Sequence, residues 1–272
     1  MSAPDVASLC ADLASERDAV VSLLDGINEA AWATPTPAEG WTISDQVGHL
    51  AWFDGAAAVA IAEPGRFAEI RAEAEASPVD FVEAVRERWA GKAGVDLQQW
   101  WSDEHARLVG AARMADPTQR VPWFGPPMSL TSKLTARIME TWAHGQDVAD
   151  ALGRRRVPTG RLRHVAHIGV RARPFSYAAH GLEMPSTEVR VELTGPDGED
   201  WQWGDPDLAD RISGPAEDFC LVVTQRRHVD DTALIITRGP AREWMGIAQA
   251  FAGAPGPGRR PGQFGAGGEE GV

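Results

Sequence analysis

Apolar residues recur at helical spacing along the first half of the chain. Residues 4–27 repeat apolar positions every three or four residues, and Gly26 supplies a stop signal near their end. A second apolar segment starts near Thr42 or Ser44, both suitable helix caps, and continues to Ala62. The Pro-Gly pair at 64–65 is expected to end this helix.

Three further helical segments follow. Residues 81–90 and 97–115 both show the helical period and are separated by two glycines, at 91 and 94. The prolines of VPWFGPPMS, residues 121–129, indicate a loop. An amphipathic stretch over residues 130–152 then ends at Gly153 and the basic run 154–156, which suits a helix C-terminus. The first half is therefore predicted to be a helix bundle of about four long helices.

The pattern changes after Pro158. Residues 161–181 look helical until Pro174, and residues 186–205 alternate apolar and polar positions on both sides of a GPDG turn, which is typical of a β-hairpin. A helix at 215–225, a β-branched run at 234–237 and a helix at 241–252 complete the second half.

These patterns predict an α+β chain with two folded domains. We assign residues 1–157 to the helix bundle and residues 158–254 to a smaller α+β domain. Residues 255–272 are rich in Gly and Pro and lack apolar periodicity, so they are expected to form a flexible tail.

Composition limits the partners. Of the 272 residues, 43% are hydrophobic, which is enough to bury a full core, and 39 acidic against 26 basic side chains give a net charge of −13. A chain this acidic repels phosphate backbones and anionic lipid, so neither nucleic acid nor a membrane is an expected partner. The oligomeric state is not readable from the sequence.

The termini and cysteines suggest a cytoplasmic protein. The N-terminal residues lack the basic and apolar regions of a secretory signal, and no apolar run approaches the length of a membrane span. Cys10 and Cys220 lie far apart and form no CxxC pattern, so they predict neither a disulfide framework nor a thiolate zinc site.

One histidine interrupts an apolar helical face. His49 lies within WTISDQVGHLAWFD, and Glu140 and His144 lie one helical turn apart in METWAHGQDVAD. Two imidazoles and one carboxylate from facing helices would form a three-ligand metal site with open coordination positions, which is typical of catalytic centres. The set suits Zn²⁺ and also Fe²⁺ or Ni²⁺. Without a metal, His49 could equally be a core or surface histidine, and Glu140 and His144 could be an ordinary i,i+4 pair on one helix.

Two quoted segments carry a family resemblance. WTISDQVGHL and, some ninety residues later, ETWAHGQDV resemble the N-terminal domain of the mycothiol-dependent maleylpyruvate isomerases, a branch of the DinB-like metal-binding four-helix bundles. The resemblance covers about residues 5–155. It implies that His49, Glu140 and His144 bind a divalent metal, usually zinc.

The second half resembles a different segment. GPAEDFCLVVTQRRHV and LIITRGPAREWMGIAQAFAG are similar to the C-terminal part of an uncharacterised actinobacterial subfamily, which has been labelled as related to wyosine base formation. The label implies tRNA chemistry, which the acidic composition does not support. By analogy with the isomerases, the resemblance implies that this domain closes over the metal site and contributes substrate contacts.

Three functions fit these observations. In the first, a metal-bound thiol cofactor such as mycothiol adds to a small electrophilic substrate, giving an isomerase or S-transferase. In the second, the ion activates water, giving a hydrolase or lyase. The third is a non-catalytic metal-binding module. We favour the first, with a small molecule and a low-molecular-weight thiol as partners.

Weaker candidates surround the predicted ligands. Asp45, Asp54 and Asp147 are candidates to accept hydrogen bonds from the ligand histidines, although capping and surface solvation are the simpler explanation for all three. The segment HIGVRARPFSYAAH offers substrate contacts, and several aromatic side chains could line a pocket beside the metal. The substrate-contact candidates are Arg171, Arg173, Tyr177 and His167, and the aromatic ones are Trp52, Trp123, Phe124 and Trp142.

Overall fold

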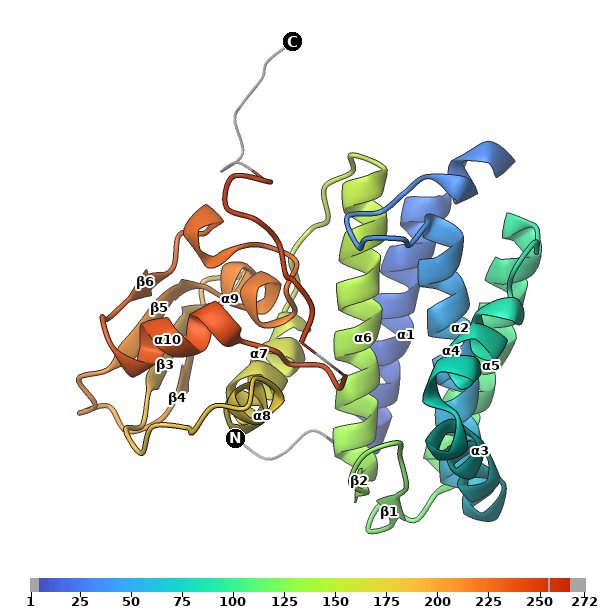
Figure 1. Ribbon diagram of the computed structural model, residues 1–272, viewed down its shortest axis with the longest axis horizontal. Helices are drawn as coiled ribbons and strands as arrows, with labels where there is room; N and C mark the ends of the chain where they lie inside the picture. The colour runs from blue at the N-terminus through green and yellow to red at the C-terminus, as the bar shows by residue number, and fades with distance from the viewer. Residues whose placement is uncertain (1–4, 254, 265–272) are drawn as a thin grey trace. The chain divides into compact units, whose positions relative to one another are not determined.

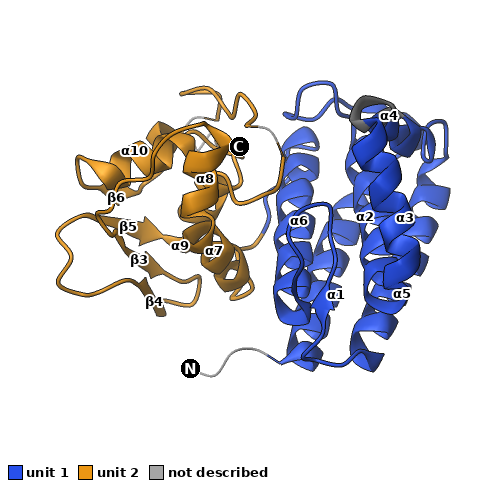
Figure 2. Ribbon diagram, turned by 60° about the horizontal axis from the view of Figure 1, so that its bottom comes forward, with its two compact units in different colours: residues 1–156 blue, residues 157–272 orange. Residues whose placement is uncertain are grey.

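The computed structural model describes residues 5–253 and 255–264. The chain divides into two compact units, Met1–Arg156 and Val157–Val272, which Figure 2 shows in different colours. No helix in the described part of the chain is both long and apolar enough to cross a membrane. Residues 265–272 of the predicted flexible tail lie outside the described residues, and its flexibility stays a prediction.

Four long helices build the first unit. These are α1 (Val6–Leu24), α2 (Ile43–Ala62), α5 (Gly94–Met114) and α6 (Leu130–Ala151). Helix α1 lies along α6, and α2 lies along α5 and also contacts α6, as Figure 1 shows. The predicted helix bundle is confirmed.

Local signals define where the helices begin. The Asp5 side chain accepts a hydrogen bond from the Ser8 backbone at the start of α1. Helix α2 opens with a capping box, in which Thr42 and Asp45 each accept from the other's backbone N–H. Ser129 caps α6 in the same way as Asp5 caps α1.

The connection between α2 and α5 is more helical than the sequence predicted. Helix α2 ends at Ala62 as expected, but Pro64 is the first residue of α3 (Pro64–Ala76), which the prediction missed. Helix α4 (Pro78–Glu87) also begins at a proline. Proline is tolerated at the first helical position because its missing N–H has no intrahelical partner there.

Short elements complete the unit. A 3₁₀ turn, η1 (Glu29–Ala33), precedes α2. Strands β1 (Arg120–Val121) and β2 (Met128–Ser129) pair antiparallel and flank the loop that was predicted from its prolines.

Two glycines allow close packing beside the predicted ligands. A Cβ atom on Gly48 would lie 2.4 Å from the Trp89 ring, and one on Gly145 would lie 2.4 Å from Val20 on α1. The glycines immediately precede His49 and follow His144, so the backbone at each histidine lies close to a neighbouring side chain.

The second unit combines helices with one mixed sheet. Its helices are α7 (Leu162–Arg171), α8 (Arg173–Ala179), α9 (Ala216–Val223) and α10 (Pro240–Ile247), with a 3₁₀ turn η2 (Val229–Asp231). Its strands are β3 (Arg190–Thr194), β4 (Asp200–Trp203), β5 (Arg211–Pro215) and β6 (Ile235–Ile236), in the order β4-β3-β5-β6.

The predicted hairpin is confirmed by the pairing of β3 with β4, which places Glu192 opposite Gln202. The prediction missed β5, which runs parallel to β3. It also placed the end of the first helix near Pro174, whereas α7 ends at Arg171 and Pro174 lies in the first turn of a second helix, α8. The α+β class is confirmed.

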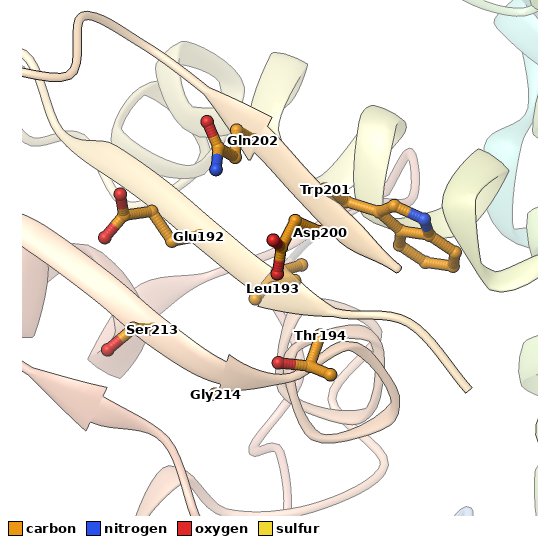
Figure 3. A pocket seen from close by; sticks show the side chains of 8 residues that line it. All are labelled: Glu192, Leu193, Thr194, Asp200, Trp201, Gln202, Ser213 and Gly214. Carbon is orange, nitrogen blue, oxygen red and sulfur yellow. The ribbon is translucent and has the colours of Figure 1, made fainter. Parts of the chain in front are cut away.

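One face of the sheet carries a shallow polar hollow, shown in Figure 3. It is lined by Glu192, Leu193, Thr194, Asp200, Trp201, Gln202, Ser213 and Gly214. Glu192 is ion-paired with Arg190 and Arg211 at 3.2 and 3.3 Å, so its carboxylate already has cationic partners. None of the predicted site residues lines this hollow.

Candidate metal centre

Helices α2 and α6 bring the three predicted ligands together. One ligand atom from each of His49, Glu140 and His144 lies within 4.8 Å of the others. Oε2 of Glu140 lies 3.3 Å from Nε2 of His144 and 3.8 Å from Nε2 of His49. The three side chains are between 12 and 24% exposed.

A chain of hydrogen bonds determines which nitrogen of His144 carries a proton. The Thr36 hydroxyl donates to the Trp41 carbonyl, and the Gln46 amide nitrogen donates to the Thr36 hydroxyl oxygen. The remaining Gln46 oxygen is an acceptor 2.5 Å from Nδ1 of His144. Nδ1 therefore holds the proton, and in the neutral ring Nε2 presents its lone pair to Glu140.

This tautomer suits a cation. In the neutral ring, Nε2 of His144 and the Glu140 carboxylate are both acceptors, and they face each other at 3.3 Å. Two lone pairs this close favour a positive charge between them, either a proton or a metal ion. The donor set of two imidazoles and one carboxylate fits zinc, nickel or iron(II).

Electrostatics keep the other two ligands in the metal-binding form. Burial, with a smaller contribution from His144, lowers the pKa of His49 to about 4, although Glu140 opposes the shift. Burial would raise the pKa of Glu140, but its contacts with His144 and His49 outweigh burial and hold the pKa well below its usual value. At neutral pH His49 is neutral and Glu140 is ionised, as metal ligation requires.

Aromatic rings surround the two histidines. The Trp41 ring stacks on His144 with centroids 5.8 Å apart and meets His49 edge-on at 5.3 Å. Phe53, one turn after His49 on α2, lies 4.3 Å from the His49 ring. These rings restrict the orientation of both imidazoles.

A buried polar layer lies beside the ligands. Asp54 on α2 is fully buried and accepts from Nε of Arg137 on α6 and from the Trp101 indole on α5, both at 2.9 Å. Nδ1 of His105 lies 3.5 Å from the same carboxylate. Burial would raise the pKa of Asp54, but Arg137, His105 and Trp101 outweigh it and lower the pKa. Asp54 thus links three helices of the bundle.

Asp45 and Asp147 were predicted to support the ligand histidines. The Asp45 carboxylate accepts from Thr42, from Arg86 at 3.3 Å and from the Trp89 indole at 3.1 Å, so it joins the start of α2 to the region of α4. Asp147 is fully buried on α6, one turn from His144. The hydrogen bond at Nδ1 of His144 is made by Gln46, which the sequence analysis did not single out.

The four aromatic residues that were predicted to line a pocket beside the metal lie in two separate parts of the first unit. The rings of Trp52, Trp123 and Phe124 form one cluster with Phe53, Phe67 and Phe81. Trp142 is buried elsewhere on α6, with the Arg156 guanidinium 5.7 Å from its ring centroid.

The predicted substrate contacts lie in the second unit and differ in environment. Arg171 is exposed at the end of α7, and His167 accepts a hydrogen bond from the Trp203 indole at 3.3 Å. Arg173 lies 5.9 Å from the ring centroid of Tyr177 and 5.7 Å from that of Trp244.

Three of these side chains hold buried donors without partners. Within the described residues, Nε and Nη2 of Arg173, the Tyr177 hydroxyl and the Trp244 indole nitrogen accept or donate no hydrogen bond. Tyr177 and Trp244 are almost completely buried. Burial, together with nearby Glu243, raises the pKa of Tyr177, so the phenol stays protonated.

Sequence profiles of two known families match the chain. A profile described as the mycothiol maleylpyruvate isomerase N-terminal domain matches residues 13–149, about half of the chain and all three candidate ligands. The chain belongs to this family. A second profile, described as wyosine base formation, matches residues 185–237, which include the hairpin, β5 and α9.

Family relatives and solved structures agree with this assignment. Two uncharacterised proteins from two strains of Mycobacterium tuberculosis are each 44% identical over 255 residues, covering 94% of this chain and 99% of each relative. Crystal structures of a mycothiol-dependent maleylpyruvate isomerase and of a histidine-to-alanine mutant of it match with a TM-score of 0.58 at 17% identity. These matches cover 84% of this chain and 93% of the isomerase, and they show a shared fold.

Proposed function

We propose that this protein is a metal-dependent enzyme that activates a low-molecular-weight thiol, such as mycothiol, for addition to a small electrophilic substrate. The observation that carries the proposal is the arrangement of His144 and Glu140, whose acceptor atoms face each other at 3.3 Å with His49 completing the set. Membership of the mycothiol maleylpyruvate isomerase family supports the choice of thiol.

The chain's own residues prepare the site for a divalent ion. His49, Glu140 and His144 would hold it, and Gln46 fixes the ring of His144 through Nδ1. A divalent ion bound by three protein ligands keeps positions open and lowers the pKa of a thiol or water that binds there. The rings of Trp41 and Phe53 pack against the imidazoles of His144 and His49.

We assign ligand contacts in the second unit to Arg173 and Tyr177. A buried donor without a partner costs about 1–3 kcal/mol, so several of them around one guanidinium favour binding of an acceptor-rich group. The Arg173 guanidinium suits a carboxylate, whereas the Tyr177 hydroxyl also lies beside Glu243. We make this assignment for the second unit by itself and do not link it to the candidate metal centre of the first unit.

Metal content of the purified full chain tests the proposal. We expect close to one divalent ion per chain in the wild type and a large loss in His49→Ala and Glu140→Gln. His228→Ala is the matched control, because His228 lies at the surface of the second unit beside Asp230. A wild-type chain that stays metal-free after incubation with zinc, nickel and iron(II) would contradict the proposal.

Thiol binding is tested on the metal-loaded protein. Titration with mycothiol at neutral pH, followed by the ultraviolet absorbance of the thiolate, should show one equivalent of thiolate in the wild type and none in Glu140→Gln. Metal binding without thiolate formation would exclude thiol activation. Turnover of an ester or amide substrate without thiol would then identify a hydrolase.

A further inference from the structure

The chain uses lysine very sparingly. Of its 26 basic side chains only two are lysines, Lys92 and Lys133, and the other 24 are arginines. Lys92 is exposed before α5, whereas Lys133 lies within α6 and is 1% exposed. Arginine stays charged under all ordinary conditions, but a lysine can lose its proton when it is buried. The buried lysine therefore differs chemically from the other cations of the chain.

Lys133 contacts an aromatic ring. Its Nζ atom lies 3.1 Å from the ring centroid of Trp123, which stacks on Phe67 with centroids 5.5 Å apart and planes inclined by 6°. Phe124 and Phe53 extend this cluster, with centroids 5.1 and 6.1 Å from that of Trp123. The amine is thus held against apolar surface.

The neighbouring carboxylates already have partners. Asp54 is bound by Arg137 and the Trp101 indole, and Glu140 faces the two ligand histidines. Within the described part of the chain, no carboxylate lies at ion-pair distance from Lys133. A buried ammonium without a counter-ion is costly, so the neutral amine is favoured.

The pKa of Lys133 is also consistent with a neutral amine in this buried position. Burial, with a smaller contribution from Arg137, lowers the pKa of Lys133 to about 6, and Glu140 only partly opposes the shift. A lysine with an ordinary pKa near 10.4 is about 0.04% neutral at pH 7, whereas one with a pKa of about 6 is mostly neutral. Desolvation of this kind activates lysine nucleophiles in enzymes.

We propose that Lys133 is a nucleophilic amine that forms an imine with the carbonyl group of a small apolar aldehyde or ketone bound against the Trp123 cluster. The nitrogen lone pair attacks the carbonyl carbon and gives a carbinolamine. The carbon–oxygen bond of that adduct then breaks and water leaves, so no oxidant or reductant is consumed. Water reverses the reaction.

The surrounding rings define the ligand class. Trp52, Phe53, Trp123 and Phe124 are each half-buried, so the cluster offers planar apolar contact and its outer part reaches solvent. Trp123 and Phe124 lie on the loop between β1 and β2, directly before α6. An aromatic aldehyde combines a flat ring with a reactive carbonyl and is the simplest probe of this class.

Competition between the two lysines tests the proposal without any substitution. The folded full chain is treated with benzaldehyde and cyanoborohydride at pH 7, which reduces the imine to a stable secondary amine, and peptides are quantified by mass spectrometry. Lys92 is the matched control, because its Nζ atom also lies near a tryptophan ring, 6.0 Å from the centroid of Trp100. We expect Lys133 to be labelled at least tenfold faster than Lys92.

Two further measurements complete the test. In urea the preference for Lys133 should disappear, because both lysines then have ordinary environments. Lys133→Arg should retain its circular dichroism and metal content while losing the rapid labelling phase. Faster or equal labelling of Lys92 in the folded chain, or labelling of Lys133 only after unfolding, would overturn the proposal. Neither result depends on whether the metal centre binds a thiol.

Discussion

Nδ1 of His144 lies 2.5 Å from the side-chain oxygen of Gln46, and this contact joins α6 to α2 directly beneath the candidate metal centre. The Gln46 amide in turn donates to Thr36, whose hydroxyl donates to the Trp41 carbonyl. The orientation of one candidate metal ligand therefore depends on a loop more than a hundred residues earlier in the chain.

Replacement of Gln46 by leucine should weaken metal binding without removing a ligand. The leucine cannot accept from Nδ1, so His144 loses the contact that holds its tautomer, and loss of such a contact typically lowers metal affinity about 10- to 100-fold. Competition with a chromophoric chelator measures the effect. Gln99→Leu is the control, because Gln99 is exposed on α5 and donates a hydrogen bond to Asp103 in its own helix. Equal zinc affinity in the two variants would disprove the role of Gln46.

Removal of Arg137 should strongly destabilise the bundle. Arg137→Met leaves the buried Asp54 carboxylate without its cation, which costs about 3–5 kcal/mol of unfolding free energy. Urea denaturation measures this value, and the double variant Asp54→Leu/Arg137→Met should recover most of it. Arg107→Met provides the surface comparison, since Arg107 is half-exposed and pairs with Glu104 one turn away on α5, so this substitution should cost about 0–1 kcal/mol.

Stability should depend on pH through Lys133. Between the folded pKa of about 6 and the unfolded value near 10.4, the unfolded chain binds one more proton at this side chain, so stability rises with pH in that window. From pH 7 to pH 9 the wild type should gain up to about 2.7 kcal/mol relative to Lys133→Met, because each pH unit contributes about 1.36 kcal/mol. Urea denaturation of both proteins at the two pH values measures the difference. A difference that does not change with pH would show that Lys133 keeps its charge in the folded state.

Alanine at two glycines should have opposite effects. Gly48→Ala places a Cβ atom 2.4 Å from the Trp89 ring, so we expect a loss of about 1–3 kcal/mol through overpacking. Gly110 lies within α5, and a Cβ atom added there would meet no other atom within 4 Å, so Gly110→Ala should stabilise the chain by about 0.5–1 kcal/mol. Thermal unfolding of the two variants distinguishes the cases. A neutral Gly48→Ala would mean that the Trp89 ring moves aside easily.

Much of the fold was predictable because it depends on local patterns. The capping residues Thr42 and Asp45 and the apolar period predicted α2, and the GPDG turn predicted the β3–β4 hairpin. Helix α3 was missed because Pro64 was interpreted as a stop, whereas the chain uses it as a first helical residue. Strand β5 pairs with a strand about twenty residues earlier, and such a long-range parallel pairing has no local signature.

The candidate site was predictable only in part. The His49 position and the Glu140–His144 spacing suggested the ligands because imidazole and carboxylate side chains are recognisable metal donors. Gln46 was missed because a neutral amide on an apolar helix carries no such signal. Asp45 was predicted to assist the histidines because it lies one turn before His49. In the structure its carboxylate binds Arg86 and Trp89 instead, and these residues lie about forty positions later in the sequence, where no local pattern indicates the contact.

The division of labour between the two units bears on how such proteins diversify. The candidate ligands, Gln46 and the Asp54 layer all lie in the unit Met1–Arg156, whereas Arg173, Tyr177 and Trp244 lie in the unit Val157–Val272. A substitution at Arg173 or Tyr177 leaves these candidate ligands unchanged, and a substitution at a candidate ligand leaves Arg173 and Tyr177 unchanged. Under the proposed function, selection can therefore change what the second unit binds while it preserves the candidate metal site of the first.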